Sequence, residues 1–267
     1  MSEESLEKAL FHLYLHIHEC DSSSELFQQF SLSREELAWL EKLIATGRQG
    51  LLTFNQQLRA KGHRYVKQSL PKSSSCFAAQ LDAILECYSL TQTEVGPRDP
   101  ASAVRAFSDF LERTDQCDKV DLRAFDLIRF ESLFIAMALD ETHSAETALA
   151  GSRDPGLWCL PPIRRCKSLT LNSDPTRCWE SDAEIEPSIG SACHLLLFAS
   201  NLRAVRVVRL SPSLHNLIDE MAKGRNVREA LTVLDYQGYE ERVLERFRSL
   251  LRLGLPFVIR ATPAESV

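Results

Sequence analysis

The sequence lacks the signatures of most cofactor-binding enzymes and of membrane proteins. Only 10 of its 267 residues are glycine, and none form a glycine-rich phosphate-binding loop. A Gly-x-Ser-x-Gly nucleophile motif and the His-x-Asp/Glu pair of many iron sites are also missing. No apolar run approaches the roughly 18–20 residues that a membrane helix needs. These absences disfavour a nucleotide-dependent enzyme, a serine hydrolase and a membrane-spanning protein.

The cysteines do not follow any metal-binding or redox spacing. Eight are present, but no two are separated as Cys-x-x-Cys, and the gaps between the later ones are irregular. The first eight residues carry three glutamates and one lysine, the reverse of a signal peptide's basic start. We therefore expect a cytoplasmic protein with free thiols, no zinc site and no membrane association.

Positive charge is scarce overall and unevenly placed. The chain has 31 Lys and Arg against 37 Asp and Glu, a net charge of −6 that disfavours nucleic acid as a partner. Residues 1–150 hold 15 basic and 23 acidic residues, whereas residues 203–260 hold 11 and 7. This reversal of sign indicates two domains that meet different partners.

Periodicity supports the same division. Residues 1–150 show successive helical patterns without a strand signal, which predicts an all-α domain. Residues 151–162 are rich in glycine and proline and are interpreted as a linker. Residues 163–267 show alternating strand patterns followed by capped helices. The expected fold class is α+β: an N-terminal all-α helical domain and a C-terminal winged helix-turn-helix-like domain with a small antiparallel sheet.

The C-terminal domain has an ordered series of predicted elements. Three strands come first, then three helices, then a short strand. The predicted strands are 167–171, 194–198 and 203–210, and the closing strand is 255–260. The predicted helices are 213–223, 227–234 and 239–253. In the third strand Val205 and Val207 should face one side of the sheet, and Arg206 the other.

One stretch of the helical domain is strongly basic. Residues 48–72 contain six Lys and Arg and no acidic residue, with apolar residues at helical spacing. The pattern predicts a helical segment interrupted near Gly62 and ended by Pro71. Two interpretations stay open: a solvated helix face, or a docking patch for an acidic partner or DNA.

Short motifs in both halves resemble a known family. In the C-terminal half they are 209–214 and 250–255; in the N-terminal half they are 65–71, 97–100, 107–111 and 127–131. The series resembles the partner proteins of multinuclear non-heme iron oxidative enzymes in ribosomal-peptide modification. These pathways include methanobactin and 3-thiaglutamate biosynthesis, and the chain length is closest to the 3-thiaglutamate partner subunits.

The resemblance implies a division of labour. A separate TIM-barrel oxidase would hold the iron and modify a cysteine, and the two chains would form a heterodimer. This chain would bind a precursor or carrier peptide with an acidic leader through a peptide recognition element. No catalytic residue, metal ligand or cofactor is then expected in this chain.

Peptide capture would use the third strand and the last helix. A leader peptide would add as a strand to the edge of 203–210, and the helix 239–253 would form the other wall of a groove. Cationic and apolar side chains on these two elements are the candidate peptide-binding residues, because the leader is expected to be acidic. They are Arg203, Val205, Arg206, Val207, Arg209, Arg242, Arg246 and Phe247. For Phe247 a core position is the competing interpretation.

Two other functions remain possible from the sequence. A winged-helix DNA-binding regulator is the first, although Arg228 is the only basic residue of the helix that would read DNA. An enzyme with Cys159 or Cys193 as its nucleophile is the second. Cys193 is adjacent to His194, although neighbours in a strand point to opposite faces. None of the seven histidines is expected to pair with a carboxylate at useful spacing.

Overall fold

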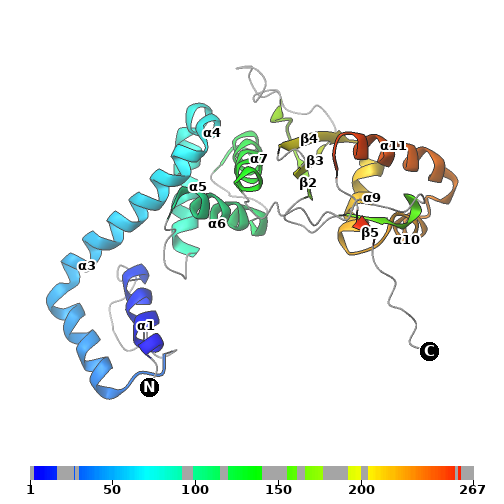
Figure 1. Ribbon diagram of the computed structural model, residues 1–267. Coiled ribbons are helices and arrows are strands. Elements are labelled where there is room, and N and C mark those ends of the chain that lie inside the picture. Colours follow the sequence, from blue (N-terminus) through cyan, green and yellow to red (C-terminus); the bar gives the residue numbers. More distant parts are fainter. Residues whose placement is uncertain are drawn as a thin grey trace, which may run out of the picture. The chain divides into compact units, whose positions relative to one another are not determined.

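The chain forms two compact units, which divide between Val120 and Asp121. The computed structural model describes residues 3–16, 27, 30–91, 99–114, 120–139, 155–160, 166–176, 192–199, 204–255 and 258–259. Each unit has its own apolar clusters, and each is described by itself below (Figure 1).

Unit 1 is helical in the part that the structure describes. Its helices are α1 (Glu3–His16), α3 (Arg34–Ser69), α4 (Pro71–Cys76), α5 (Ala78–Thr91) and α6 (Pro100–Arg113). Local signals fix where they begin. The Ser33 hydroxyl accepts from the Glu36 amide, and the Glu36 carboxylate accepts from the Ser33 amide at 2.7 Å, a capping box that starts α3. Asp99 and Ser102 form a similar box at the start of α6.

Helix α3 runs for 36 residues without a break. The sequence predicted an interruption near Gly62, and this prediction is wrong: the helix passes through Gly62 and ends at Ser69. A single glycine costs a helix only about 1 kcal/mol, which neighbouring turns offset. Pro71 does end α3, and it then occupies the first turn of α4, where its missing amide is not needed.

Two sets of contacts flank α3 along its length. Near its start, Leu40 and Leu51 pack with Ala9 and Leu13 of α1 in one apolar cluster. Farther along, α3 contacts α4, α5 and α6, as Figure 1 shows. Between α5 and α6, Tyr88 meets Phe107 edge to face, with ring centroids 5.3 Å apart. The helical pattern predicted from the sequence is therefore confirmed for these segments.

Unit 2 combines helices with a small sheet. Its helices are α7 (Leu122–Ala138), α9 (Pro212–Ala222), α10 (Val227–Val233) and α11 (Glu240–Arg252), with short 3-10 turns η1 (Pro155–Leu157) and η3 (Gln237–Tyr239). Its strands are β1 (Trp158–Cys159), β2 (Cys166–Leu171), β3 (Cys193–Ala199), β4 (Val205–Leu210) and β5 (Val258–Ile259). The fold class α+β is confirmed at this level: a mainly helical chain with a small three-stranded antiparallel sheet.

The three-stranded sheet has the order β2-β3-β4 and is antiparallel throughout. Alternating side chains give it two covered faces. Leu195 and Leu197 of β3 pack in one cluster with Phe130 of α7. Leu196 and Phe198 pack in another cluster, which the helices after β4 complete. In Figure 1, α7 accordingly lies on one side of the sheet, and α9 and α11 lie on the other.

A buried carboxylate attaches α7 to the sheet. Asp126 is 1% exposed, and its Oδ2 atom accepts hydrogen bonds from the amides of Asn172 (2.7 Å) and Ser173 (2.8 Å) just after β2. The sequence assigned α7 to the helical domain and placed a linker at residues 151–162. The compact units instead divide ahead of α7, because this helix packs on the sheet.

The segment predicted as linker contributes to unit 2. Within it, β1 pairs with β5 in a two-stranded antiparallel ribbon, and Trp158 joins the apolar cluster of α9 to α11. In the described parts of the chain, no helix has the length and apolar character needed to cross a membrane.

Candidate functional site

Strand β4 forms one edge of the three-stranded sheet. Residues Val205–Leu210 pair with β3 in the register Ala199↔Val205 to His194↔Leu210. On its other side β4 pairs with no strand among the described residues. An edge strand of this kind presents backbone N–H and C=O groups that another strand can pair with. The edge of β4 is therefore the candidate functional site.

The side chains of β4 divide between the two faces as the sequence predicted. Val205 and Val207 pack with the cluster under α7, whereas Val208 packs with the cluster under α9 to α11. Arg206 is exposed on the latter face. Arg209 is exposed on the α7 face and forms an ion pair with the nearly buried carboxylate of Asp174. The edge thus carries two exposed cations, one on each face. Arg203, the third arginine predicted here, lies outside the described residues.

Helix α11 presents its arginines and buries its aromatic residue. Arg242 and Arg246 are exposed, one turn apart on the helix surface. Phe247 is 0% exposed and packs in the cluster that includes Phe198 and Leu250. Phe247 is therefore a core residue here, as its competing interpretation expected, and a peptide on the surface would not reach it.

The strand and the helix are joined through their apolar sides. Val208 and Leu210 of β4, and Leu250 and Leu251 of α11, belong to one apolar cluster or pack against it. The amphipathic pattern of α11 places Arg242 and Arg246 along one flank of its apolar stripe, and Arg248 and Arg252 along the other. This arrangement offers two chemically matched arginine pairs on a single helix.

A second polar cluster, which the sequence analysis missed, connects α9 to β2 and β3. His215 Nε2 lies 3.3 Å from Asp219 Oδ2 and 2.7 Å from Thr170 Oγ1. The rings of His215 and His194 stack with centroids 4.3 Å apart, and Ser168 donates to Asp219 at 2.6 Å. The expectation that no histidine pairs with a carboxylate is therefore wrong. The i, i+4 spacing of His215 and Asp219 on a predicted helix was the signal that would have found this pair.

The geometry of this cluster does not suit acid–base catalysis. In a hydrolytic triad the carboxylate holds one ring nitrogen while the other takes a proton from the nucleophile. Here Asp219 and Thr170 both approach Nε2 of His215, and the buried Nδ1 has no hydrogen-bond partner among the described residues. Burial lowers the pKa of His215, the stacked His194 adds to that effect, and Asp219 opposes it. The cluster fixes α9 against the sheet with a neutral imidazole.

The buried thiols are poor nucleophiles. Cys193 is 6% exposed on the α7 face, and burial raises the pKa of its thiol, with the nearby Asp126 adding to the effect. Burial also raises the pKa of Cys166 to about 12. Because the thiolate is the reactive form, both cysteines stay protonated at neutral pH. His194 does not activate Cys193, since the two side chains lie on opposite faces of β3.

Across the parts of the chain that the structure describes, no three His, Cys, Asp or Glu residues are grouped so that they could hold a metal ion. No protein-family model matches the chain, and no curated protein matches it either.

Proposed function

We propose that this chain is a non-catalytic partner subunit that binds a precursor or carrier peptide and presents its cysteine to a separate iron-dependent oxidase. The observation that carries the proposal is the open edge of β4 with the exposed Arg206 and Arg209. A peptide strand added there would gain backbone hydrogen bonds from β4, and the two arginines would attract an acidic leader.

The order of elements supports this use of the edge. Three antiparallel strands are followed by α9, α10 and α11, the order expected of a winged helix-turn-helix-like peptide recognition element. Strand β2 is the other edge of the sheet, but two of its side chains, Ser168 and Thr170, are engaged with α9. The arginines make β4 the better edge for an anionic peptide.

Titration of a labelled acidic leader peptide, followed by fluorescence anisotropy, tests where the peptide binds. Reversing both charges of β4 (Arg206→Glu with Arg209→Glu) should raise the dissociation constant about tenfold or more, since like charges then meet. Arg242→Glu with Arg246→Glu should weaken binding as well. The matched pair Arg248→Glu with Arg252→Glu, on the opposite flank of α11, should leave it within about twofold. Equal losses of affinity for both α11 pairs would contradict a binding groove between α11 and β4.

A second experiment tests strand addition itself. In an added strand only every other peptide N–H points toward β4. N-methylation of the leader at one set of alternate positions should therefore abolish binding, and methylation at the intervening positions should not. Uniform sensitivity along the peptide would contradict strand addition. A loss caused by Lys167→Glu on β2 would place the peptide at the opposite edge.

Co-expression tests the oxidase partnership. The chain and a TIM-barrel iron oxidase encoded beside it should elute as a heterodimer, with iron in the oxidase chain. Separate elution of the two chains, with peptide binding retained, would support peptide capture and contradict the partnership with the oxidase.

One observation favours DNA binding as the second candidate. Helix α10 follows α9 after a short turn that contains Gly224 at φ 89°, an order that resembles a helix-turn-helix. Arg228 is the only basic residue of α10, however, which leaves little for reading base edges. Steeply salt-dependent binding of duplex DNA, lost on Arg228→Ala, would favour this candidate over peptide capture.

A further inference from the structure

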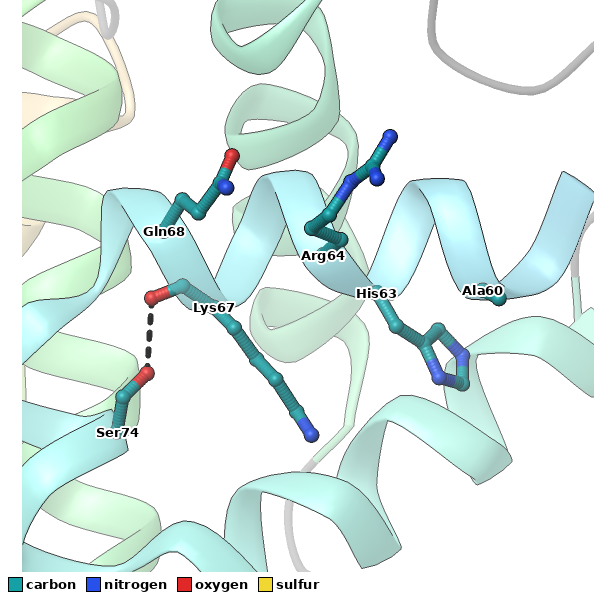
Figure 2. A pocket seen from close by; sticks show the side chains of 6 residues that line it. All are labelled: Ala60, His63, Arg64, Lys67, Gln68 and Ser74. Carbon is teal, nitrogen blue, oxygen red and sulfur yellow. Dashed lines mark hydrogen bonds between the residues drawn. The ribbon is translucent and has the colours of Figure 1, made fainter.

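Unit 1 contains a cavity that the function proposed above does not use. It lies on the last turns of α3, where α4 begins, and has a volume of about 440 Å³. Five side chains of α3 and one of α4 line it: Ala60, His63, Arg64, Lys67, Gln68 and Ser74. In Figure 2, Arg64 and Gln68 point to one side of α3, and His63 and Lys67 point to the other. The cavity therefore spans two adjacent ridges of a single helix.

The cavity belongs to the most cationic part of unit 1. Six of the 13 Lys and Arg residues of unit 1 lie in residues 48–72, and none of its 17 Asp and Glu residues do. Arg64 is exposed and has no ion-pair partner among the described residues. Lys67 forms an ion pair with Asp82, but both side chains are about 40–50% exposed, so water and salt screen the pair. Asp82 and Glu86 also lie near His63, so acidic groups offset the positive charge on the side of α3 that carries His63 and Lys67. The guanidinium of Arg64, which points to the other side, is therefore the main positive charge of the cavity.

The remaining polar groups of the cavity have limited capacity to bind an anion. The Ser74 hydroxyl donates to the Lys67 carbonyl at 2.8 Å, drawn as the dashed line in Figure 2. His63 Nε2 lies 2.6 Å from the Ser89 hydroxyl, and burial lowers the pKa of His63. The available donors are therefore the planar guanidinium of Arg64, the exposed amide of Gln68 and the outer N–H groups of Lys67.

We infer that this cavity binds glutamate or aspartate side chains of an acidic peptide segment on a protein partner. A planar guanidinium beside an amide matches the two oxygens of a carboxylate. A phosphate group would call for several convergent backbone N–H donors, and the cavity is lined by side chains in the helix interior, where the amides are already paired. Ala60 and the methylene groups of Lys67 and Arg64 supply an apolar floor for the aliphatic part of a glutamate.

The test uses the full-length chain and a labelled glutamate-rich peptide, with its glutamine counterpart as the uncharged probe. The titration is done in the Arg206→Glu, Arg209→Glu background, so that β4 does not contribute. Arg64→Glu should weaken binding of the glutamate peptide about tenfold, and the glutamine peptide should bind neither protein. Arg48→Glu is the matched control, because it changes the same charge on the same helix about 24 Å away. Equal losses at positions 48 and 64 would reduce the site to a diffuse basic surface and overturn the inference.

A second measurement does not depend on affinity. A benzophenone amino acid at position 60 should crosslink the glutamate peptide, and the same group at position 48 should not. Tighter binding of duplex DNA than of the peptide, with the same dependence on Arg64, would also overturn the inference. The variants that test this cavity lie in unit 1, and those that test leader binding at β4 lie in unit 2. A negative result for one proposal therefore leaves the other unaffected.

Discussion

The hydroxyl and the backbone amide of Ser173 both donate to one carboxylate oxygen of Asp126, at 2.9 and 2.8 Å. The two residues are 47 positions apart, and both are buried. Since the amide of Asn172 donates to the same oxygen, one side chain of α7 satisfies three donors at the end of β2. This contact holds α7 on the sheet together with the apolar packing of Phe130 and Leu133.

Removing this carboxylate should destabilise unit 2. Asp126→Ala leaves the donors of Ser173 and Asn172 without their acceptor in a buried site, at a cost of about 3 kcal/mol or more. Asp126→Asn keeps an acceptor oxygen. Burial raises the pKa of the Asp126 carboxyl, which means that the charged form is disfavoured there, so the neutral asparagine should cost less stability than Asp126→Ala. Urea unfolding curves of the three proteins measure the difference. Equal stability of the alanine and asparagine variants would contradict the role of the acceptor.

The placement of Phe247 gives a second prediction. Phe247→Ala should lower the free energy of unfolding by about 3–5 kcal/mol, because it opens a cavity in the core of unit 2. Tyr239→Ala is the matched control: this aromatic residue precedes α11 and is 60% exposed, so the change should stay within about 0.5 kcal/mol. Similar small effects of both changes would mean that Phe247 lies on a surface.

Two glycines give a third prediction, because alanine should stabilise the protein at one position and destabilise it at the other. A Cβ atom added at Gly50, inside α3, would meet nothing within 4 Å, so Gly50→Ala should stabilise the protein by about 1 kcal/mol. Gly224 has φ 89°, so Gly224→Ala should destabilise the turn between α9 and α10 by about 1–2 kcal/mol. Thermal unfolding measures both changes. Destabilisation by Gly50→Ala would indicate that a neighbour touches this part of α3.

Two histidines, the buried His215 and the partly buried His63, predict a loss of stability in mild acid. Burial is the main cause that lowers the pKa of both His63 and His215 in the folded state. The unfolded chain, with a histidine pKa of about 6.5, therefore binds more protons below that pH. The histidine contribution to stability is thus complete above about pH 6.5 and decreases as the pH falls toward the lower folded-state values.

Unfolding curves at successive pH values between neutral and mildly acidic conditions check this prediction. The protein carrying both His63→Gln and His215→Gln should show a flatter dependence of stability on pH than the unchanged protein. Charged groups around each histidine also affect its pKa. They are Lys67, Asp82 and Glu86 near His63, and Asp219 and His194 near His215. Parallel curves for the two proteins would assign the acid sensitivity to other groups.

The sequence predicted the features that neighbouring residues determine. The end of α3 before Pro71 and the strand faces of Val205 and Val207 are each decided within a few residues. The helix prediction that failed involves competition between local and extended effects. It was the break at Gly62, where the rest of a 36-residue helix outweighs one unfavourable residue.

Contacts between segments far apart in the sequence could not be predicted from it. Asp126 meets residues 46 and 47 positions away, and Thr170 meets His215 after 45. The pairing of β1 with β5 joins segments about 100 residues apart. No periodicity encodes such pairings, so the position of α7 on the sheet and the contacts of His215 with Thr170 and His194 required the structure. The faces of the β4 side chains were predictable because side chains alternate along a strand.

The two covered faces of the β2-β3-β4 sheet have a kinetic consequence. Since α7 occupies one face and α9 and α11 occupy the other, the sheet can grow only at an edge, and an added strand displaces no core residue. For the peptide capture proposed above, the entropy cost of binding would come from ordering the peptide and not from rearranging this unit. Association should accordingly follow a single exponential whose rate rises linearly with peptide concentration and slows with added salt.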